Sequence, residues 1–430
     1  MSSAFLYCIL MLFGLAGIGA PIALSMIVSA IFYLFMKGQD PGLAAEQIIQ
    51  GLYDSFLLLA VPLFIVAANI MNAGTISERL LRFCVALVGR FRGGLGHVNV
   101  VSNMIFAGMS GSAVADAVGL GKIIIGMMTK DGRYPAGYAA AITAAASTIG
   151  PIIPPSIPMV MYALVSDTSI GYLFLGGIVP GIVMGVVLMV MNARMAHRMG
   201  VPLEEPVPAR ELPALTLRAA PALMMPVILL YGIYGGATTP TEAAAVAAFY
   251  SLLVAGLFYR ALSLKTLYGI FSESARATAS VGLVIGAALI FNYIVASENI
   301  PAAVSKLMQG LDISPLGFLI LVNVLFLVLG CLLDATTIIL VIIPLFIPTC
   351  RALGIDLVHF GVVAVVNCMI GLITPPYGVL LFVINAITGI PLQTIIRAVW
   401  PFIGVLVAAL AAMILIPDIV LFVPKLFGYK

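Results

Sequence analysis

Apolar runs of about 20 residues recur along the whole sequence, and each is long enough to cross a hydrocarbon core about 30 Å thick as a helix. The chain has 430 residues, of which 63% are hydrophobic and only 9% charged, and this excludes an ordinary water-soluble domain. Unpaired backbone groups are costly in lipid, so the runs must form helices. The sequence therefore predicts an all-α polytopic membrane protein, and we expect the first run to be retained as its first helix.

Other classes of protein lack support. The net charge of +3 is small and no basic cluster is interleaved with aromatic residues, which argues against a nucleic-acid partner. The five cysteines lack a C-x-x-C spacing and are interpreted as free buried thiols. The three histidines are far apart and form no metal-ligand pair. An enzyme would need a nucleophile or a metal cluster within the bundle, and the scattered Cys and His offer neither.

The second half of the chain repeats the features of the first at an offset of about 220 residues. A small-residue turn ends at Pro21 and again at Pro240. Each half then has a Gly/Ser/Thr-rich tip with one aspartate, Asp116 or Asp334, and later an apolar segment interrupted by Gly and a Pro-Pro pair, TIGPIIPPS or GLITPPYG. The common order of these landmarks indicates a duplication.

The duplication predicts how the chain is divided. The first repeat covers 1–198 and the second 219–430, with a proline-rich polar joint at 199–218. Each repeat would contain helices, an interfacial arm, a re-entrant hairpin and a broken helix, and would cross the membrane an odd number of times. An odd number gives inverted structural repeats, as in many secondary transporters. With both termini outside, most lysines and arginines lie inside, as the positive-inside rule requires.

The two Pro-Pro segments are expected to break a helix within the membrane. Proline stops the helix and leaves carbonyls without partners, which is tolerated only beside protein or a cavity. Free carbonyls are hard oxygen ligands suited to Na⁺, and the new half-helix N-termini can face an anion. We therefore interpret each break as a binding site made from backbone. A proline kink used only for packing is the alternative.

The Gly/Ser/Thr-rich tips would supply the other wall of each site. Their small residues allow close approach, and their hydroxyls can bind. Asp116 and Asp334 are costly at membrane depth, so each would bind an ion or substrate, or would cap a short helix or make a structural hydrogen bond. No arginine lies clearly within a span, so dipoles, hydroxyls, co-bound cations or Lys122 would have to hold an anionic solute.

Further segments have structural interpretations. Thr239 or Thr241 is expected to cap a helix that has Pro240 in its first turn. The segment 78–94 interleaves arginines with apolar residues, which predicts an amphipathic helix at the cytoplasmic interface and leaves room for a partner surface. Five asparagines are expected to make hydrogen bonds between or within helices: Asn69, Asn103, Asn292, Asn367 and Asn385.

Five segments together resemble one family: GMSGSAVADAVG, KDGRYPAGYAAAITAAASTIGPIIPPSIPMVMYA, GGATTPTEAAAVAAF, LDATTIILVIIPLFIPT and HFGVVAVVNCMIGLITPPYG. They resemble the large membrane subunit of the TRAP (tripartite ATP-independent periplasmic) transporters over nearly the whole chain. The resemblance implies a Na⁺-coupled secondary active transporter with an elevator mechanism. It also implies two partners, a small four-helix membrane subunit and a periplasmic substrate-binding protein that delivers a carboxylate such as a C4-dicarboxylate, a sialic acid or another sugar acid.

Carried over to this chain, the resemblance implies two sites for sodium or substrate, each formed by one tip and one break. The candidates are Ser110, Gly111, Ser112, Asp116, Thr148, Gly150 and Pro151 in the first half, and Gly330, Asp334, Thr336, Thr337, Gly371, Thr374 and Pro375 in the second. Na⁺ would be the co-transported ion, and no other metal is expected.

The sequence thus predicts the transport subunit of a Na⁺-coupled importer of organic acids in the bacterial inner membrane, multi-pass, with both termini periplasmic. The alternative is a stand-alone divalent-anion/Na⁺ symporter of the same architecture. That protein would need no binding protein, so uptake by the purified chain alone would favour it.

Overall fold

The computed structural model describes residues 2–54, 56–72, 76–201, 203, 207–310 and 313–429, and these residues form helices and no strand. The first half contains α1 (Ser3–Gly17), α2 (Ile22–Met36), α3 (Gly42–Asp54), α4 (Ala60–Met71), α5 (Ile76–Val88), α6 (Gly94–Ser110), α7 (Ala113–Asp116), α8 (Lys122–Thr129), α9 (Ala136–Ser147), α10 (Ile157–Ser166) and α11 (Ile170–Met199). The second half contains α12 (Leu212–Tyr234), α13 (Pro240–Leu253), α14 (Leu264–Ser297), α15 (Ile300–Gly310), α16 (Pro315–Gly330), α17 (Ala335–Thr337), α18 (Ile347–Ala352), α19 (Leu357–Gly371), α20 (Val379–Thr388), α21 (Leu392–Leu415) and α22 (Asp418–Leu426). The predicted all-α architecture is confirmed.

Two predicted segments are only partly covered. Residues 73–75 of the first arm, and residues 202 and 204–206 of the joint, lie outside the described residues. Within the joint, α12 already begins at Leu212, where Pro213 occupies the first turn. Proline is well tolerated there because the first backbone N–H groups of a helix have no partner within it.

Five helical segments within the described residues are long and apolar enough to cross a membrane: α11, α12, the continuous run Pro240–Phe258, α14 and α21. Other apolar segments are shorter. The helices α1 and α2 have 15 residues each, or about 22 Å of length, less than a full crossing of the hydrocarbon core. The small-residue turn that ends at Pro21 separates them. The chain therefore combines full spans with helices that reach only part of the way.

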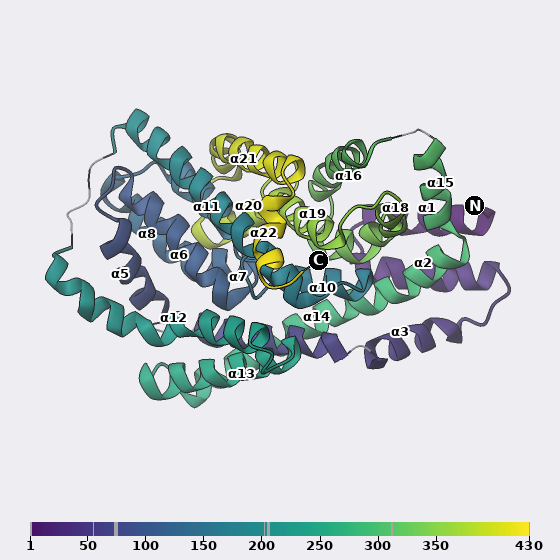
Figure 1. The fold of residues 1–430 in the computed structure, drawn as a ribbon, viewed down its shortest axis with the longest axis horizontal. Helices are drawn as coiled ribbons and strands as arrows, with labels where there is room; N and C mark the ends of the chain where they lie inside the picture. Colours follow the sequence, from purple (N-terminus) through teal and green to yellow (C-terminus); the bar gives the residue numbers. More distant parts are fainter. Residues whose placement is uncertain are drawn as a thin grey trace.

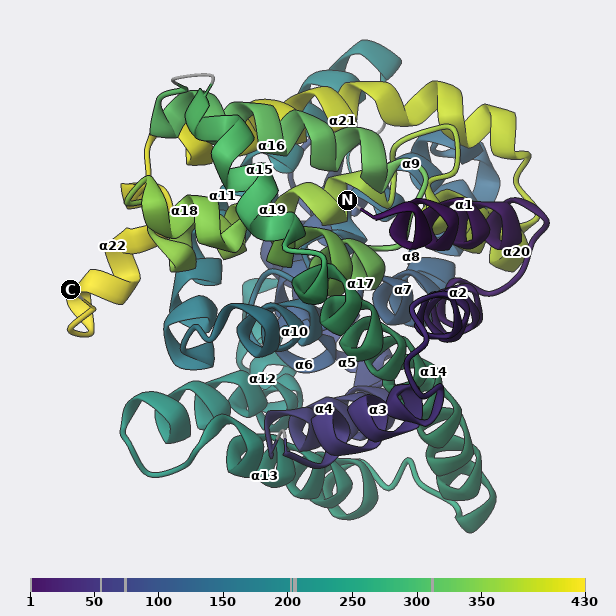
Figure 2. The same cartoon turned by 90° about the vertical axis from the view of Figure 1, so that its right-hand side faces the viewer.

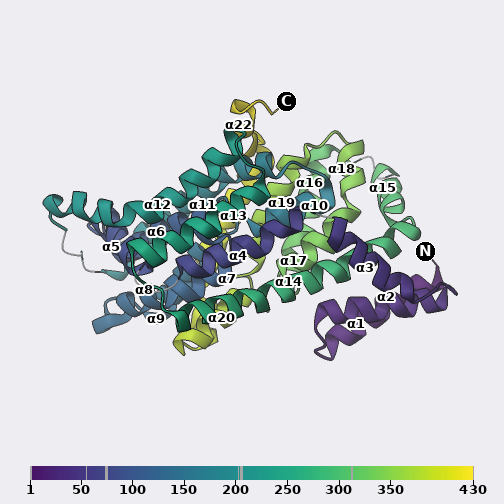
Figure 3. The same cartoon turned by 90° about the horizontal axis from the view of Figure 1, so that it is seen from below.

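The helices pack into two groups (Figures 1 and 2). The peripheral group comprises α1–α4 and α12–α14, in which α13 packs on α4, and α14 packs on α2, α3 and α4. The 34-residue α14 runs along much of the molecule, as Figure 3 shows. The inner group comprises α6–α11 and α16–α22. The helix α5 contacts α6 and α12, and α15 contacts α14 and α18, so these two arms connect the groups.

The helices α9 and α19 form the centre of the inner group. Every residue of α9 from Gly137 to Ser147 is buried, and so is every residue of α19 from Val358 to Gly371. The alanine-rich sequence of α9 explains its close packing against α6 and α21, since small side chains let helices approach. These two helices are the first halves of the two predicted broken helices.

Matching hydrogen bonds hold each hairpin to its central helix. Ser147 of α9 donates to the side-chain oxygen of Asn103 on α6 (3.3 Å), and Asn367 of α19 donates to that of Asn323 on α16 (2.9 Å). The partners in each pair are 44 residues apart. Four of the five asparagines named above bond between helical segments, Asn69, Asn103, Asn292 and Asn367, which confirms the prediction for them. Asn385 instead donates to the Ile390 carbonyl just beyond the end of its own helix.

Two further predictions about local structure are also confirmed. Thr239 caps α13, and Glu242 completes a capping box by accepting from the Thr239 backbone N–H (2.7 Å). The arm α5 is an amphipathic helix whose buried face includes Leu80 and Cys84. Leu87 on the same helix is exposed.

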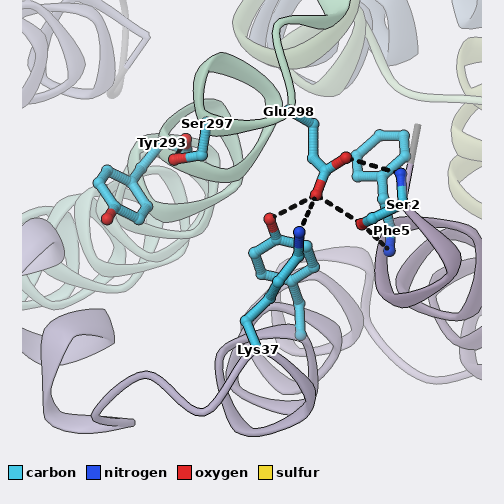
Figure 4. A network of polar contacts seen from close by, with 7 residues as sticks. Ser2, Phe5, Lys37, Tyr293, Ser297 and Glu298 are labelled. Carbon is cyan, nitrogen blue, oxygen red and sulfur yellow. Dashed lines mark hydrogen bonds and ion pairs between the residues drawn. The ribbon is translucent and has the colours of Figure 1, made fainter.

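A buried carboxylate fastens the N-terminal helices to the end of α14 (Figure 4). Glu298 lies just beyond α14, outside the spanning segment, and its side chain is 6% exposed. It pairs with Lys37 (2.8 Å) and accepts hydrogen bonds from Tyr33 (2.8 Å) and from the Ser2 backbone N–H and hydroxyl. Lys37, followed by Ser2, lowers the pKa of Glu298 to about 2. This one side chain therefore joins the start of α1, the end of α2 and the end of α14.

We expect Glu298→Gln to lower the free energy of unfolding by about 1–3 kcal/mol, because it removes the ion pair and leaves partly buried donors without a charged acceptor. Because the folded-state pKa is lower than the ordinary 4.5, the carboxylate stabilises the fold above that pH and loses the effect as the pH falls toward 2. Thermal unfolding in detergent should show the full difference at pH 7 and a shrinking one below pH 4.5.

Asp418→Asn is the matched control. It breaks the Lys425–Asp418 pair (2.6 Å), whose side chains are 55% and 71% exposed, so it should change stability by less than about 1 kcal/mol. Equal effects of the two substitutions would contradict a special role for Glu298.

Candidate functional site

The first tip joins two arms of a helical hairpin. The arm α6 ends at Ser110, and Gly111 turns the chain with a φ of 58°, a conformation that favours glycine. Ser112 then caps α7 by accepting from the Ala115 N–H. A π-helical segment, Ala117–Gly121, continues from α7 into α8. The small residues of GMSGSA thus make a tight turn and start the returning helix.

The second tip has the same order of elements. The arm α16 ends at Gly330, Asp334 caps α17, and a π-helical segment, Ile338–Ile342, follows. The Asp334 carboxylate accepts from the backbone N–H of Thr337 (3.1 Å) and from its hydroxyl. The capping role considered for Asp334 is therefore confirmed.

The structural correspondence between the tips differs from the one expected from sequence. We paired Asp116 with Asp334 because each is the acidic residue of its tip. As capping residues, however, Ser112 and Asp334 are equivalent, and Asp116, four residues beyond its cap, then corresponds to Ile338, the first residue of the π-helical segment. The sequence comparison paired the wrong residues because Asp334 is at the helix cap, whereas Asp116 lies about one turn beyond its cap.

Both Pro-Pro segments interrupt a helix, as predicted. The first break separates α9 from α10, which begins at Ile157 with Ser156 as its cap, and the Ser156 hydroxyl also donates to the Pro151 carbonyl. The second break separates α19 from α20. There Thr374 donates to the Ile370 carbonyl (2.7 Å). At both breaks, a side-chain hydroxyl thus donates a hydrogen bond to a backbone carbonyl.

Each tip packs directly against the break of its own half. A Cβ on Gly111 would lie 2.6 Å from the Pro155 carbonyl oxygen. A Cβ on Gly330 would lie 3.1 Å from the Cα of Gly371. Only glycine permits such backbone contacts. The predicted meeting of tips and breaks therefore occurs in both halves.

Asp116 is the most unusual polar group at these contacts. Its side chain is fully buried, and neither carboxylate oxygen has a hydrogen-bond partner of ordinary geometry among the described residues, although the Ser110 side chain lies close by. A Cβ on Gly150 would lie 2.3 Å from Asp116 Oδ2. The carboxylate therefore lies against the backbone of the first break. A buried charge without partners favours a bound cation or a proton.

A cavity of 640 Å³ lies where the two tips meet the peripheral helices. The first tip lines it from Ser110 to Ala115, and the second from Asp334 to Thr336. Pro151 and Leu372 come from the two breaks. The peripheral wall belongs to α4 and α14 and includes Asn69, Asn72, Ile270, Glu273, Ala277 and Val281. One cavity therefore contacts both halves of the inner group and the peripheral group.

The residues predicted from the sequence fall into two groups, those that line the cavity and those that lie behind its wall. The residues that line the cavity are Ser110, Gly111, Ser112, Pro151, Asp334 and Thr336. The others lie at or next to the tip–break contacts and do not line it: Asp116, Thr148, Gly150, Gly330, Thr337, Gly371, Thr374 and Pro375. Thr148 is buried, and its hydroxyl donates to the Ala145 carbonyl (2.6 Å). Thr337 is also buried.

The charge of the cavity wall differs from the expectation that Lys122 could hold an anionic solute. Lys122 is exposed and does not line the cavity, so it is not placed to hold an anionic solute there. Among the described residues, the lining contains no lysine or arginine, but it contains the carboxylates of Asp334 and Glu273. Sequence reasoning missed Glu273. The available signal was an acidic residue in the polar stretch SESARATAS, which precedes the apolar part of α14.

Comparison with known proteins identifies the family. Residues 9–419 match the DctM component of the tripartite ATP-independent periplasmic transporter. The chain is 40% identical over 418 residues to the sialic acid TRAP transporter large permease protein SiaM of Vibrio cholerae, covering 97% of both. It is 40% identical over 375 residues to the C4-dicarboxylate TRAP transporter large permease protein DctM of Pseudomonas aeruginosa, covering 87% of this chain and 88% of that one.

A solved structure supports the fold. The YdaH transporter of Alcanivorax borkumensis superposes with a TM-score of 0.62 over 85% of this chain and 86% of its own, at 15% identity. At this identity the likeness concerns the fold alone. The near-complete match to the DctM component, together with the relatives at 40% identity, places the protein in the family of TRAP transporter large permeases, which are integral inner-membrane transport proteins and not enzymes.

Proposed function

We propose that this chain is the transport subunit of a Na⁺-coupled importer that moves a carboxylate-bearing solute across the inner membrane. The observation that carries the proposal is the 640 Å³ cavity, which both tips, both breaks and the peripheral helices line together. A transport site must contact a part that can move and a part that can stay fixed. This cavity contacts the two groups of helices at once.

The proposed mechanism is an elevator movement. The peripheral helices α1–α4 and α12–α14 act as the scaffold, and the inner group with both hairpins moves against it. The hydrogen bonds that Ser147 donates to Asn103 and Asn367 donates to Asn323 support movement of each hairpin with its central helix. The matching caps and π-helical segments support a duplication, and we propose that the two repeats are inverted in the membrane.

Na⁺ is proposed to bind where each tip meets its break. At the first contact, the unpartnered Asp116 carboxylate and the backbone beside Gly150 provide hard oxygen ligands in a fully buried position. At the second contact, Asp334 already accepts two hydrogen bonds from Thr337. Its remaining lone pairs and nearby carbonyls are the candidates there.

The solute is proposed to bind in the cavity through neutral groups. The first residues of α10 and α20, Ile157 and Val379, line the cavity, so the positive ends of two helix dipoles face it. Each of these helices has ten residues. Two half-helix N-termini and the hydroxyls of Ser110, Ser112 and Thr336 can hold a carboxylate without a basic side chain. Sialic acids, other sugar acids and C4-dicarboxylates are the candidate solutes.

The partners are proposed to be a small four-helix membrane subunit and a periplasmic binding protein that delivers the solute. The tripartite organisation in the family's description supports this. We also propose that both chain termini are periplasmic. This orientation puts the arginines of α5 and the basic ends of α11 and α12 on the cytoplasmic side, in agreement with the positive-inside rule.

We expect Na⁺ to raise the unfolding temperature of the purified protein in a saturable way, because a ligand at 100 times its dissociation constant adds about 2.7 kcal/mol. K⁺ and choline at matched ionic strength should not. Asp116→Asn keeps the side-chain shape but removes the charge, and it should raise the half-saturating Na⁺ concentration about tenfold or more. Asp131→Asn, an exposed aspartate outside the cavity, is the matched control. Identical curves for Na⁺ and K⁺ would contradict the sodium sites.

Gly150→Ala tests the contact between the tip and the break. The added methyl group would meet Asp116 Oδ2 at 2.3 Å, so the carboxylate must move and the Na⁺-dependent stabilisation should be lost. Gly126→Ala on α8 of the same hairpin is the control, because nothing lies within 4 Å of its Cβ position. Retained Na⁺ stabilisation in Gly150→Ala would place the cation elsewhere.

Transport itself is tested in proteoliposomes that contain this chain and its small membrane subunit. Uptake of a labelled sialic acid or C4-dicarboxylate should require both an inward Na⁺ gradient and the cognate binding protein. Asp116→Asn should reduce the rate about tenfold or more, and Asp131→Asn should not. Saturable uptake by the purified chain alone, without binding protein, would instead support a stand-alone symporter.

A further inference from the structure

A second cavity lies away from the transport site, between the arm α5 and the start of α12. Its volume is 470 Å³, and it is lined by Glu78, Arg79, Arg82, Leu215 and Arg218. Arg79 and Arg82 are three residues apart on one helix and so lie on the same face. Three arginines and one glutamate give this cavity a positive charge, in contrast to the acidic lining of the transport cavity.

A buried tyrosine positions two of these arginines. The guanidinium of Arg79 lies 4.8 Å from the centre of the Tyr259 ring, a distance at which the ring attracts the cation. The hydroxyl of the same tyrosine donates to the Arg218 backbone carbonyl (2.8 Å). Tyr259 is 7% exposed. It therefore fixes Arg79 of α5 relative to the first turns of α12, and the cavity is arranged before any ligand arrives.

Apart from the contact of Arg79 with the Tyr259 ring, the charges of these arginines have no partner of opposite charge among the described residues. Among the described residues, none of the three is in an ion pair, and Arg82 and Arg218 are exposed. Guanidinium groups bind phosphate with paired, charge-assisted hydrogen bonds. Three such groups around one cavity therefore favour a phosphate ester as the ligand.

The surface beside the cavity distinguishes a lipid from a soluble phosphate. Around and beyond Arg218, α12 presents apolar side chains to the exterior: Leu217, Met224 and Val227 are 76%, 42% and 52% exposed. This helix is one of the membrane-spanning candidates. A ligand whose phosphate occupies the arginine cavity could thus lay acyl chains along α12. A soluble phosphate would leave that surface unused.

We propose that the cavity between α5 and α12 binds the phosphate headgroup of an anionic phospholipid. Basic cavities between membrane helices near the membrane surface are suited to such lipids. The bound lipid would join the arm α5, which leads into the first hairpin, to α12 of the peripheral group. It would thereby fasten the first hairpin to the scaffold at a point distant from the transport cavity.

The test measures thermal unfolding of the full-length protein in detergent with added dioctanoyl phosphatidylglycerol, dioctanoyl phosphatidylcholine or potassium phosphate, at constant ionic strength. Phosphatidylglycerol should raise the unfolding temperature in a saturable way, and half-saturation should need at least tenfold more phosphatidylcholine. Arg82→Gln/Arg218→Gln should raise the half-saturating phosphatidylglycerol concentration at least tenfold. Arg194→Gln/Arg198→Gln on α11 is the control, with the same change in charge and both residues outside the cavity.

Several outcomes would overturn the proposal. Equal stabilisation by potassium phosphate would assign the cavity to a soluble phosphate. An equal loss of phosphatidylglycerol affinity in the α11 control would show that the effect depends only on net charge. Unchanged phosphatidylglycerol binding together with lost assembly of the small subunit would make the cavity a protein-docking surface. If the double variant does not fold, Arg82→Gln alone, at an exposed position, should still raise half-saturation at least threefold.

Discussion

Backbone groups freed by an interrupted helix need partners inside an apolar protein, and this requirement shapes the whole inner group of helices. The two breaks cannot stand alone in the bundle. Each is covered by a hairpin tip whose glycine allows main chain to meet main chain, at Gly111 against Pro155 and at Gly330 against Gly371. The hairpins, the buried central helices α9 and α19, and the cavity between the tips all follow from meeting that requirement twice.

Much of this could be predicted from the sequence because proline, glycine and capping residues act locally. The two breaks, the tips and the Thr239 cap follow from chemistry within a few residues. The equivalence of Ser112 with Asp334 could not be found, because it depends on which side chain begins the returning helix and not on charge. Glu273 was missed for a related reason: α14 brings it to the cavity from far along the chain, and periodicity does not say which face of a long helix meets a partner.

The transport cavity and the cavity between α5 and α12 carry opposite charges. Acidic side chains lie at the contact between the inner and peripheral groups, and unpaired arginines lie at the contact of α5 with α12. In the proposed function, the positive field at the solute comes from the N-termini of α10 and α20 and not from side chains. A dipole of this kind requires no flexible cation to be desolvated at each cycle, and in the proposed function this would let one cavity accept carboxylates that differ greatly in their remaining groups.

The two tips have the same order of helical elements but differ in where their carboxylate lies. In the first half the carboxylate lies behind the tip, buried against Gly150, whereas in the second it caps the returning helix at the cavity wall. The serine that caps the first tip is neutral. A ligand at the first tip would therefore encounter a sealed negative charge, and a ligand at the second tip a charge open to the cavity. The two halves of this protein therefore share a helix geometry but differ in the position of their negative charge.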